Sequence, residues 1–151
     1  MGYRNLQETV SALEKTGQLK RLDIEVDPYL EIGAIQRRVY AADGPALLFS
    51  RVKGCGFPML GNLFGTLARA RYLFRDTLPA IARMVELKVD PGLAMRNLPA
   101  TLALGRHAWS LLPKPVSRGP VLEKTTRLAG LPQLVSWPND GGAFITLPQV
   151  Y

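Results

Sequence analysis

Residues 22–50, LDIEVDPYLEIGAIQRRVYAADGPALLFS, carry the clearest indication of fold in this sequence. At its start apolar and charged side chains alternate, which is typical of a half-buried strand. Asp27 and Pro28 then predict the start of a helix, because Asp caps well and Pro costs nothing in a first turn. Apolar side chains follow at helical spacing, at Ile32, Ile35 and Val39. A second apolar run closes the stretch, so we expect strand, helix and strand in succession.

Both flanks of this stretch extend the same pattern. Upstream, Asn5 is expected to cap a helix, and Glu8 to complete a pair similar to a capping box. Downstream, Lys53-Gly54-Cys55-Gly56 lies between two apolar runs, which predicts a hairpin. Residues 1–65 are therefore predicted to form one small N-terminal domain of the α/β (α+β) class.

The rest of the chain divides into two further segments. Residues 66–118 predict a basic, helical connector. Within it, residues 78–88 are expected to form a helix with Ile81 and Val85 facing inward. After a proline-rich linker, residues 119–151 are expected to begin a new domain.

The composition is that of an ordinary globular protein. The 151 residues are 47% hydrophobic and 21% charged. The apolar runs are far shorter than the ~20 residues that a membrane-spanning helix needs. Cys55, the single cysteine, excludes an internal disulfide and suits a reducing compartment. We therefore expect a cytoplasmic protein.

The net charge of +7 is unevenly placed along the chain. Residues 51–118 hold 11 Lys and Arg but only three Asp and Glu. Such an excess suits an acidic protein, an anionic membrane surface or a nucleic acid, or is simply a solvated face. Because the charges form no run, the solvated or protein-docking face is favoured. The segment lacks the interleaved aromatic residues of single-strand binders, so no nucleic acid is expected.

Few residues suggest a chemical site. His107 has no second histidine or cysteine at metal-ligand spacing, and Cys55 lies in a predicted turn, so both are expected to be structural. The stretch Gly61 to Thr66 joins a strand to a helix, and such a helix start can hold an anion. An ordinary turn with Thr66 as the cap is the favoured alternative.

The stretch SWPNDGGAFITLPQVY, residues 136–151, predicts a turn followed by a strand. Residues 137–142 combine Pro, Asn, Asp and Gly, which favour tight turns. Residues 144–147 are apolar or β-branched, as in strands. Nothing follows that could pair with this strand, so we expect these residues to begin a sheet that the 151 residues do not complete.

Four stretches, in this order, resemble the N-terminal portion of the UbiD-type decarboxylases. They are YRNLQETVSALEKTGQLKRLDIEVDPYLEI (residues 3–32), GPALLFSRVKGCGFPMLGNLFGT (44–66), GPVLEK (119–124) and LPQLVSWPNDGGAFITLPQVY (131–151). The resemblance runs through nearly the whole chain and leaves only the helical middle loosely matched.

The resemblance implies reversible, non-oxidative decarboxylation of an aromatic or α,β-unsaturated carboxylic acid. It implies prenylated FMN as the cofactor, held with manganese and potassium ions and supplied by a separate flavin prenyltransferase. It also implies a split β-barrel that binds the flavin, of which residues 119–151 are the start, and a homo-oligomer at full length. The competing hypothesis is a non-catalytic α/β module that docks through its basic middle.

Thr146 is the one residue that carries over as cofactor-binding, because it matches a strand position facing the flavin pocket in related members. An ordinary strand threonine is the equal alternative. The family's Asn-x-Gly-x-x-Arg stretch and later carboxylates have no matching positions, so no catalytic residue or metal ligand is assigned. The 151 residues alone are expected to be inactive. Asn139 and Leu147 depart from the ubiquinone-pathway branch, so 4-hydroxy-3-polyprenylbenzoate and another aryl or unsaturated acid both stay open as the substrate.

Overall fold

The computed structural model of the chain describes residues 3–96, 99, 101, 102, 104, 105, 109, 112, 113, 115, 117–119 and 123–143. The chain forms two compact units. The first, which we call the α/β unit, comprises Arg4–Ala70 and Thr125–Tyr151. The second, the helical unit, comprises Met1–Tyr3 and Arg71–Lys124.

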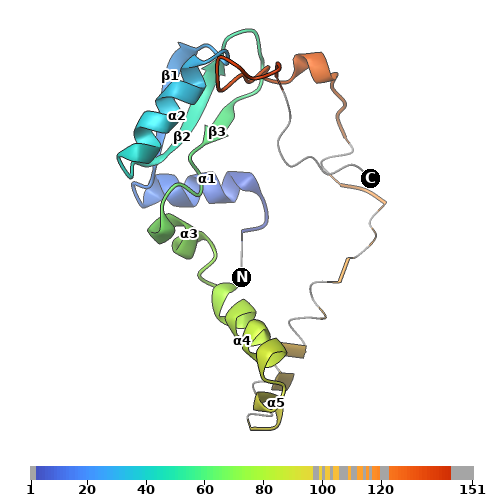
Figure 1. Ribbon diagram of the computed structural model, residues 1–151. Coiled ribbons are helices and arrows are strands. Elements are labelled where there is room, and N and C mark those ends of the chain that lie inside the picture. Colours follow the sequence, from blue (N-terminus) through green and yellow to red (C-terminus); the bar gives the residue numbers. More distant parts are fainter. Residues whose placement is uncertain are drawn as a thin grey trace. The chain divides into compact units, whose positions relative to one another are not determined.

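The α/β unit is built on a three-stranded mixed sheet (Figure 1). Its elements are α1 (Leu6–Lys15), β1 (Leu19–Val26), α2 (Glu31–Ala41), β2 (Ala46–Val52), β3 (Met59–Gly61) and the 3₁₀ helix η2 (Leu128–Gly130), while α3 (Leu67–Leu73) spans the boundary with the helical unit. β1 pairs in parallel with β2, and β2 pairs antiparallel with β3. The predicted α/β class and the predicted hairpin are confirmed.

The strand predicted from alternation is β1, but the alternation does not hold throughout. Leu22 pairs with Phe49 and Glu25 with Arg51, so one extra residue is accommodated in β1 between these two pairs. Such a bulge changes which face the next side chains occupy. Ile24 is accordingly 64% exposed.

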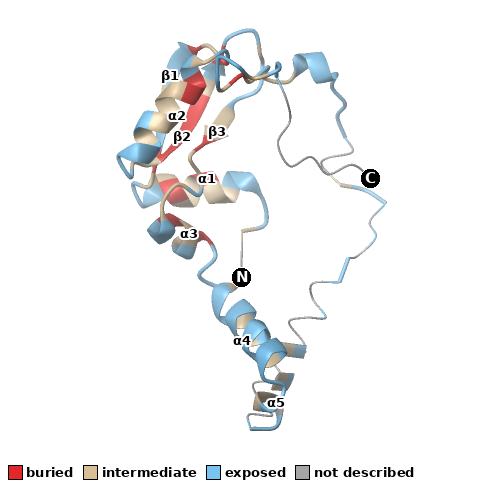
Figure 2. Ribbon diagram, in the orientation of Figure 1, coloured by how far each residue is buried: buried red, intermediate tan, exposed pale blue. Residues whose placement is uncertain are grey.

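The main hydrophobic core lies between α2 and one face of the sheet (Figure 2). Its buried members are Val26, Ile32, Leu47, Phe49 and Val52. Because side chains alternate along a strand, Leu48 faces the other side of the sheet. There it lines a groove of about 360 Å³ together with Val10 of α1. Helices therefore cover both faces of the sheet.

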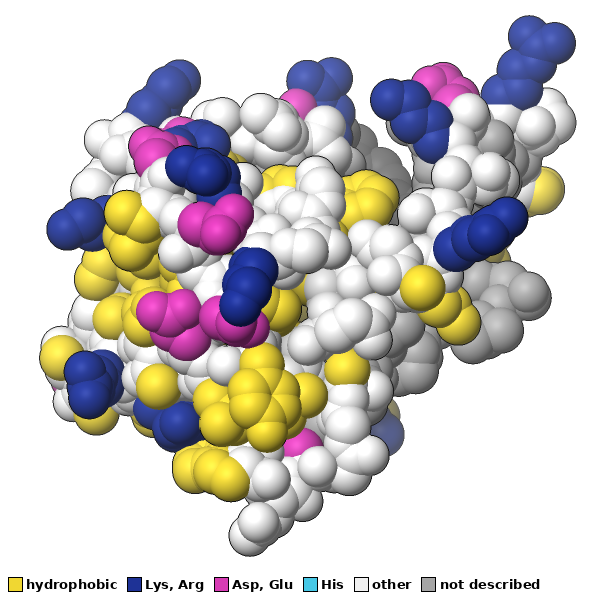
Figure 3. All heavy atoms as spheres, turned by 90° about the horizontal axis from the view of Figure 1, so that it is seen from above, with side chains coloured by type: hydrophobic (Ala, Val, Ile, Leu, Met, Phe, Trp, Pro, Cys, Tyr) yellow, Lys and Arg dark blue, Asp and Glu magenta, His cyan; other side chains and the backbone are white. Residues whose placement is uncertain are grey.

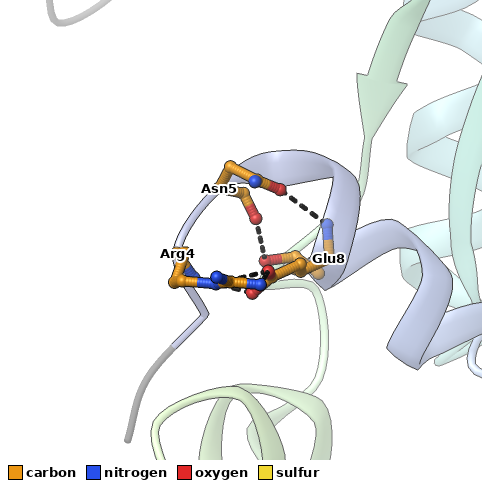
Figure 4. Close-up of polar contacts among 4 residues, drawn as sticks. Arg4, Asn5 and Glu8 are labelled. Atoms are coloured by element: carbon orange, nitrogen blue, oxygen red, sulfur yellow. Dashed lines mark hydrogen bonds and ion pairs between the residues drawn. The ribbon is translucent and has the colours of Figure 1, made fainter. Parts of the chain in front are cut away.

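Asn5 caps α1 as predicted, because its Oδ1 accepts a hydrogen bond from the Glu8 amide at 2.9 Å. The Glu8 carboxylate reaches back to Arg4 rather than to Asn5 (Figure 4). It accepts from the Arg4 amide at 2.9 Å and from Arg4 Nε at 2.8 Å. These hydrogen bonds, that of the Arg4 amide first, lower the pKa of Glu8 from its ordinary value of 4.5.

Arg69 of α3 is 3% exposed, and its guanidinium is held by main-chain carbonyl groups. Nη2 donates to the Asn62 carbonyl at 2.7 Å, Nε to that of Leu63 at 3.0 Å and Nη1 to that of Gly44 at 3.1 Å. Burial lowers the pKa of Arg69, but an arginine in a protein stays charged. The buried charge therefore ties the loop before α3 to the turn before β2.

The helical unit contains α4 (Leu78–Val89) and α5 (Leu93–Arg96), and α4 corresponds to the helix predicted over residues 78–88. Ile81 and Val85 are 48% and 56% exposed, so the prediction that they face inward is wrong. A helical period places apolar side chains on one face of a helix, but they become buried only where a second element packs against that face. Within the described residues, α4 buries none of its side chains (Figure 2).

We predict that Arg69→Met lowers the free energy of unfolding by about 2–4 kcal/mol, because three half-buried carbonyl groups lose the hydrogen bonds that the buried guanidinium donates. Urea unfolding followed by circular dichroism measures this. Arg71→Met makes the same change at an exposed position of α3 and is expected to alter stability by less than about 0.5 kcal/mol. Equal effects of the two substitutions would contradict the role of the buried guanidinium.

We also predict that the Glu8 carboxylate stabilises the fold in a pH-dependent way. Because its pKa is lower in the folded chain, the stabilisation is full above the unfolded value of 4.5 and is lost as the pH falls through the folded value. The stability difference between the native chain and Glu8→Gln should therefore shrink towards acid pH. Asp43→Asn, which removes another exposed carboxylate, is the control. A difference that stays constant from neutral to acid pH contradicts the prediction.

Candidate functional site

The candidate site lies where the segment after η2 meets the N-terminal half of α2. We call residues 130–142 the docked segment. It begins near the β2–β3 hairpin, where Cys55 Sγ contacts the Gly130 carbonyl at 3.4 Å. Leu134 packs on the core, and Val135 forms a parallel bridge with Tyr29. All of these residues belong to the α/β unit.

The start of α2 corrects the prediction made for Asp27 and Pro28. The helix begins at Glu31, and Asp27 Oδ1 instead accepts from the Tyr29 amide at 2.8 Å. Leu30 has a φ of 65°, and the Glu31 amide donates to the Tyr29 carbonyl at 2.8 Å. This is the γ-turn with positive φ at its centre, a rare and strained form.

The cause of this altered start is tertiary. The Leu30 amide donates to the Val135 carbonyl at 2.8 Å, and the Val135 amide donates to the Pro28 carbonyl at 3.2 Å. Residues 28–30 thus pair with the docked segment instead of entering the helix. Main-chain pairing with a remote residue offsets the strain at Leu30.

Arg37 holds the next part of the docked segment from the middle of α2. Its Nη1 donates to the Ser136 carbonyl at 2.8 Å, and its guanidinium lies 4.2 Å from the centre of the Trp137 ring. Gly33, one turn earlier, allows the close approach. A Cβ at Gly33 would lie 3.0 Å from both the Cα and the carbonyl oxygen of Ser136.

The predicted turn over residues 137–142 is confirmed in the described residues. The Asp140 amide donates to the Trp137 carbonyl at 3.0 Å. The Asp140 carboxylate accepts from the Ser136 amide at 3.0 Å and from the Trp137 amide at 2.9 Å. Gly142 has a φ of 126°, which favours glycine. The Asp140 side chain therefore stabilises the turn by accepting hydrogen bonds from main-chain amides.

The stretch Gly61 to Thr66 has the ordinary turn that the sequence favoured over an anion site. Thr66 Oγ1 accepts from the Arg69 amide at 3.2 Å, so Thr66 caps α3. The carbonyl groups of Asn62 and Leu63 point at the Arg69 guanidinium. The loop therefore binds a cation of its own chain.

Two of the residues singled out from the sequence lie outside the described residues, namely His107 and Thr146. The strand predicted over residues 144–147 lies outside them as well. Cys55 lies in the turn after β2, as predicted, and is half-buried. The described residues contain no group of three or more His, Cys, Asp or Glu that could hold a metal.

Several charged side chains of the α/β unit pair with one another. Lys53 Nζ donates to Asp27 Oδ2 at 2.8 Å, which lowers the pKa of Asp27 and raises that of Lys53. On the face shown in Figure 3, Lys and Arg side chains stand singly, several of them beside an Asp or Glu. No helix among the described residues is long and apolar enough to cross a membrane.

Sequence reasoning missed Gly33 and Arg37, the two residues of α2 that hold the docked segment. A signal for Gly33 was present, because a glycine within a helical pattern costs about 1 kcal/mol relative to alanine and calls for a packing reason. Arg37 carried no such signal. Its partner, the Ser136 carbonyl, is 99 residues away in the sequence.

Known proteins match this chain over most of its length. It is 39% identical to proteins of Chlamydia trachomatis serovar D and Chlamydia muridarum, both over 97% of this chain, and to one of Chlamydia caviae over 100% of it. All three relatives are described only as uncharacterized. The chain spans 26% of the length of each of them.

Two solved structures are similar to a smaller part. One is an evolved dimeric form of the UbiD-class enzyme HmfF from Pelotomaculum thermopropionicum in complex with prFMN. It is 39% identical, with a TM-score of 0.37, and the match covers 40% of this chain and 14% of that chain. The other is HmfF of the same organism in complex with FMN, with 37% identity, a TM-score of 0.41, and coverage of 44% and 15%.

The family match decides the assignment. Residues 10–88, just over half of the chain, match the 3-octaprenyl-4-hydroxybenzoate carboxy-lyase N-terminal domain. This range includes β1, α2, β2 and β3, the elements that build the sheet and its main core. The chain therefore belongs to the UbiD family of carboxy-lyases, as a representative of its N-terminal domain.

Proposed function

We propose that this chain is the N-terminal part of a non-oxidative, reversible decarboxylase. Its substrate is an aromatic or α,β-unsaturated carboxylic acid, and its cofactor is prenylated FMN. The observation that carries the proposal is the match of residues 10–88 to the N-terminal domain of a carboxy-lyase. The 26% share of the relatives' length supports a chain that works as one portion of a larger enzyme.

The proposed cofactors are prenylated FMN with manganese and potassium, and a flavin prenyltransferase supplies the flavin. The two HmfF structures hold prFMN and FMN. When bound, the modified flavin supplies an electron sink while carbon dioxide leaves, and the protein positions and tunes it. The proposed assembly is a homo-oligomer.

The described residues of this chain offer a scaffold for that chemistry. They contain no group of side chains that could hold a metal, and the proposed flavin contact, Thr146, lies beyond them. No step of the reaction is therefore assigned to a described residue. These residues bind the docked segment, because Arg37 of α2 donates to Ser136 and the turn before α2 pairs with Val135. The docked segment directly precedes the segment that carries Thr146.

Docking through the basic middle is the less favoured function. Part of the charge excess of residues 51–118 is used inside the fold. Arg69 is buried among carbonyl groups, Lys53 pairs with Asp27, and Arg75 donates to the Tyr3 hydroxyl at 2.9 Å within the helical unit.

We predict that the protein as its gene encodes it, produced together with a flavin prenyltransferase, retains flavin and releases carbon dioxide from at least one aromatic or α,β-unsaturated acid. The absorbance spectrum and mass of the released flavin and the evolved carbon dioxide are measured. Residues 1–151 produced alone should release none. A protein that retains no flavin, but binds an acidic protein in a strongly salt-dependent way, would support docking instead.

We predict that Thr146→Val weakens flavin binding about fivefold, because a hydroxyl that donates to or accepts from the cofactor contributes about 1 kcal/mol. Thr146→Ser keeps the hydroxyl and is expected to retain the affinity. Titration of the apoprotein with FMN, followed by flavin fluorescence, measures both. Equal affinities of the Val variant and the native protein would leave Thr146 as an ordinary strand residue.

A further inference from the structure

We propose that Arg37 is a positioning residue. Its contacts with Ser136 and Trp137, which we call the latch, hold the docked segment on α2 and so set where the chain enters the segment that carries Thr146. The functional part of this inference rests on the proposed function. The latch itself is carried by contacts within the α/β unit.

The first support is the pair of contacts that Arg37 makes. One guanidinium serves two successive residues, because Nη1 donates to the Ser136 carbonyl and Cζ lies over the Trp137 ring. A hydrogen bond from a charged donor is stronger than a neutral one, and an arginine over a tryptophan ring adds further attraction. A lysine could supply the charge but not both contacts together.

The second support is the close approach at Gly33. Any larger residue would place its Cβ 3.0 Å from the main chain of Ser136, too close for Ser136 to stay where it is. Gly33 is buried within α2, where alanine would suit an isolated helix better. The absence of a side chain therefore serves the docking of Ser136 and not the helix.

The third support is the strained γ-turn at Leu30. Leucine disfavours a positive φ, and strained residues of this kind persist only when surrounding contacts over-determine them. Here the contacts are the two main-chain hydrogen bonds to Val135, next to the residue that Arg37 holds. Release of the docked segment would remove both bonds and leave Leu30 free to relax.

The fourth support is the internal order of the turn that follows. The Asp140 carboxylate binds the amides of Ser136 and Trp137, the same two residues that Arg37 contacts from the other side. The turn is therefore held on α2 with its internal hydrogen bonds formed. Movement of Ser136 would therefore carry residues 137–142 with it.

The test compares two variants that weaken the latch through different atoms. Arg37→Met removes the guanidinium with its hydrogen bond and its contact with the ring. Gly33→Ala keeps the guanidinium but places a Cβ 3.0 Å from the main chain of Ser136 and 3.2 Å from Arg37 Nη1, so that both must shift. Arg38→Met, an exposed arginine of α2, is the matched control. All are made in the protein as its gene encodes it.

The first readout is hydrogen exchange of the Leu30 and Val135 amides, which are protected only while the segment is docked. Arg37→Met and Gly33→Ala should each speed this exchange about tenfold, while Arg38→Met leaves it unchanged. Exchange at the native rate in both latch variants would overturn the latch. This readout needs no flavin.

The second readout is the affinity for FMN, measured by the quenching of flavin fluorescence. If only the docked form places the next segment correctly, both latch variants should bind up to about tenfold more weakly, and Arg37→Lys should recover part of the loss. A loss confined to Arg37→Met would mean that Arg37 touches the flavin itself, and would overturn the positioning role. Native affinity in both variants would overturn it too.

The two proposals fail in different ways. If the native protein binds no flavin, the proposed function is overturned, and the positioning role falls with it, whatever the exchange shows. If the native protein binds flavin and the latch variants match it in affinity, the proposed function stands and the positioning role is overturned.

Discussion

Two parallel strands cannot be joined by a tight turn, so the pairing of β1 with β2 requires a connection that crosses the sheet. That connection is α2, and its apolar side must be buried against the sheet for the crossover to be stable. Ile32 packs with Phe49 and Leu47 in the core that results. The main core and the docked segment both depend on this helix.

α2 has a second role, because residues of the same helix hold the docked segment. Arg37 and Gly33 contact Ser136, and the turn that leads into the helix pairs with Val135. The helix therefore joins a region early in the chain to one near its end. Such long-range contacts cost more loop-closure entropy than local ones, so several are needed to hold the segment in place. The strain at Leu30 and the glycine within the helix are local costs that these contacts offset.

Two arginines of this protein direct their charge at main-chain carbonyl groups of the fold. Arg69 neutralises carbonyl dipoles at the joint between β3 and α3, and Arg37 does so at the docked segment. Arginine suits both places, since its planar group donates in several directions at once and stays charged when buried. A basic composition is therefore a weak guide to partners for this chain. Membership of the UbiD family rests instead on the match of residues 10–88 to the family's N-terminal domain.

Features that depend on neighbours along the chain can be predicted from the sequence. Asn5 and Thr66 cap their helices because the amides that they bind are three residues away. The hairpin and the turn over residues 137–142 follow from Gly, Pro and Asp in the same way. The α/β class follows from the order of these local elements. Resemblance added the family, which composition and spacing could not show.

Features that depend on residues far apart in the chain follow from the tertiary fold. Asp27 and Pro28 are good helix starters, yet α2 begins at Glu31, because Val135 competes for the main chain before it. Ile24 is exposed because of the bulge in β1, which depends on how β1 aligns with β2. Ile81 is exposed because a helical pattern in the sequence does not supply a second element that would cover it. The roles of Arg37 and Arg69 depend on carbonyl groups that every residue carries. The local sequence does not show which carbonyl group a distant arginine will contact, because only the fold brings the two together.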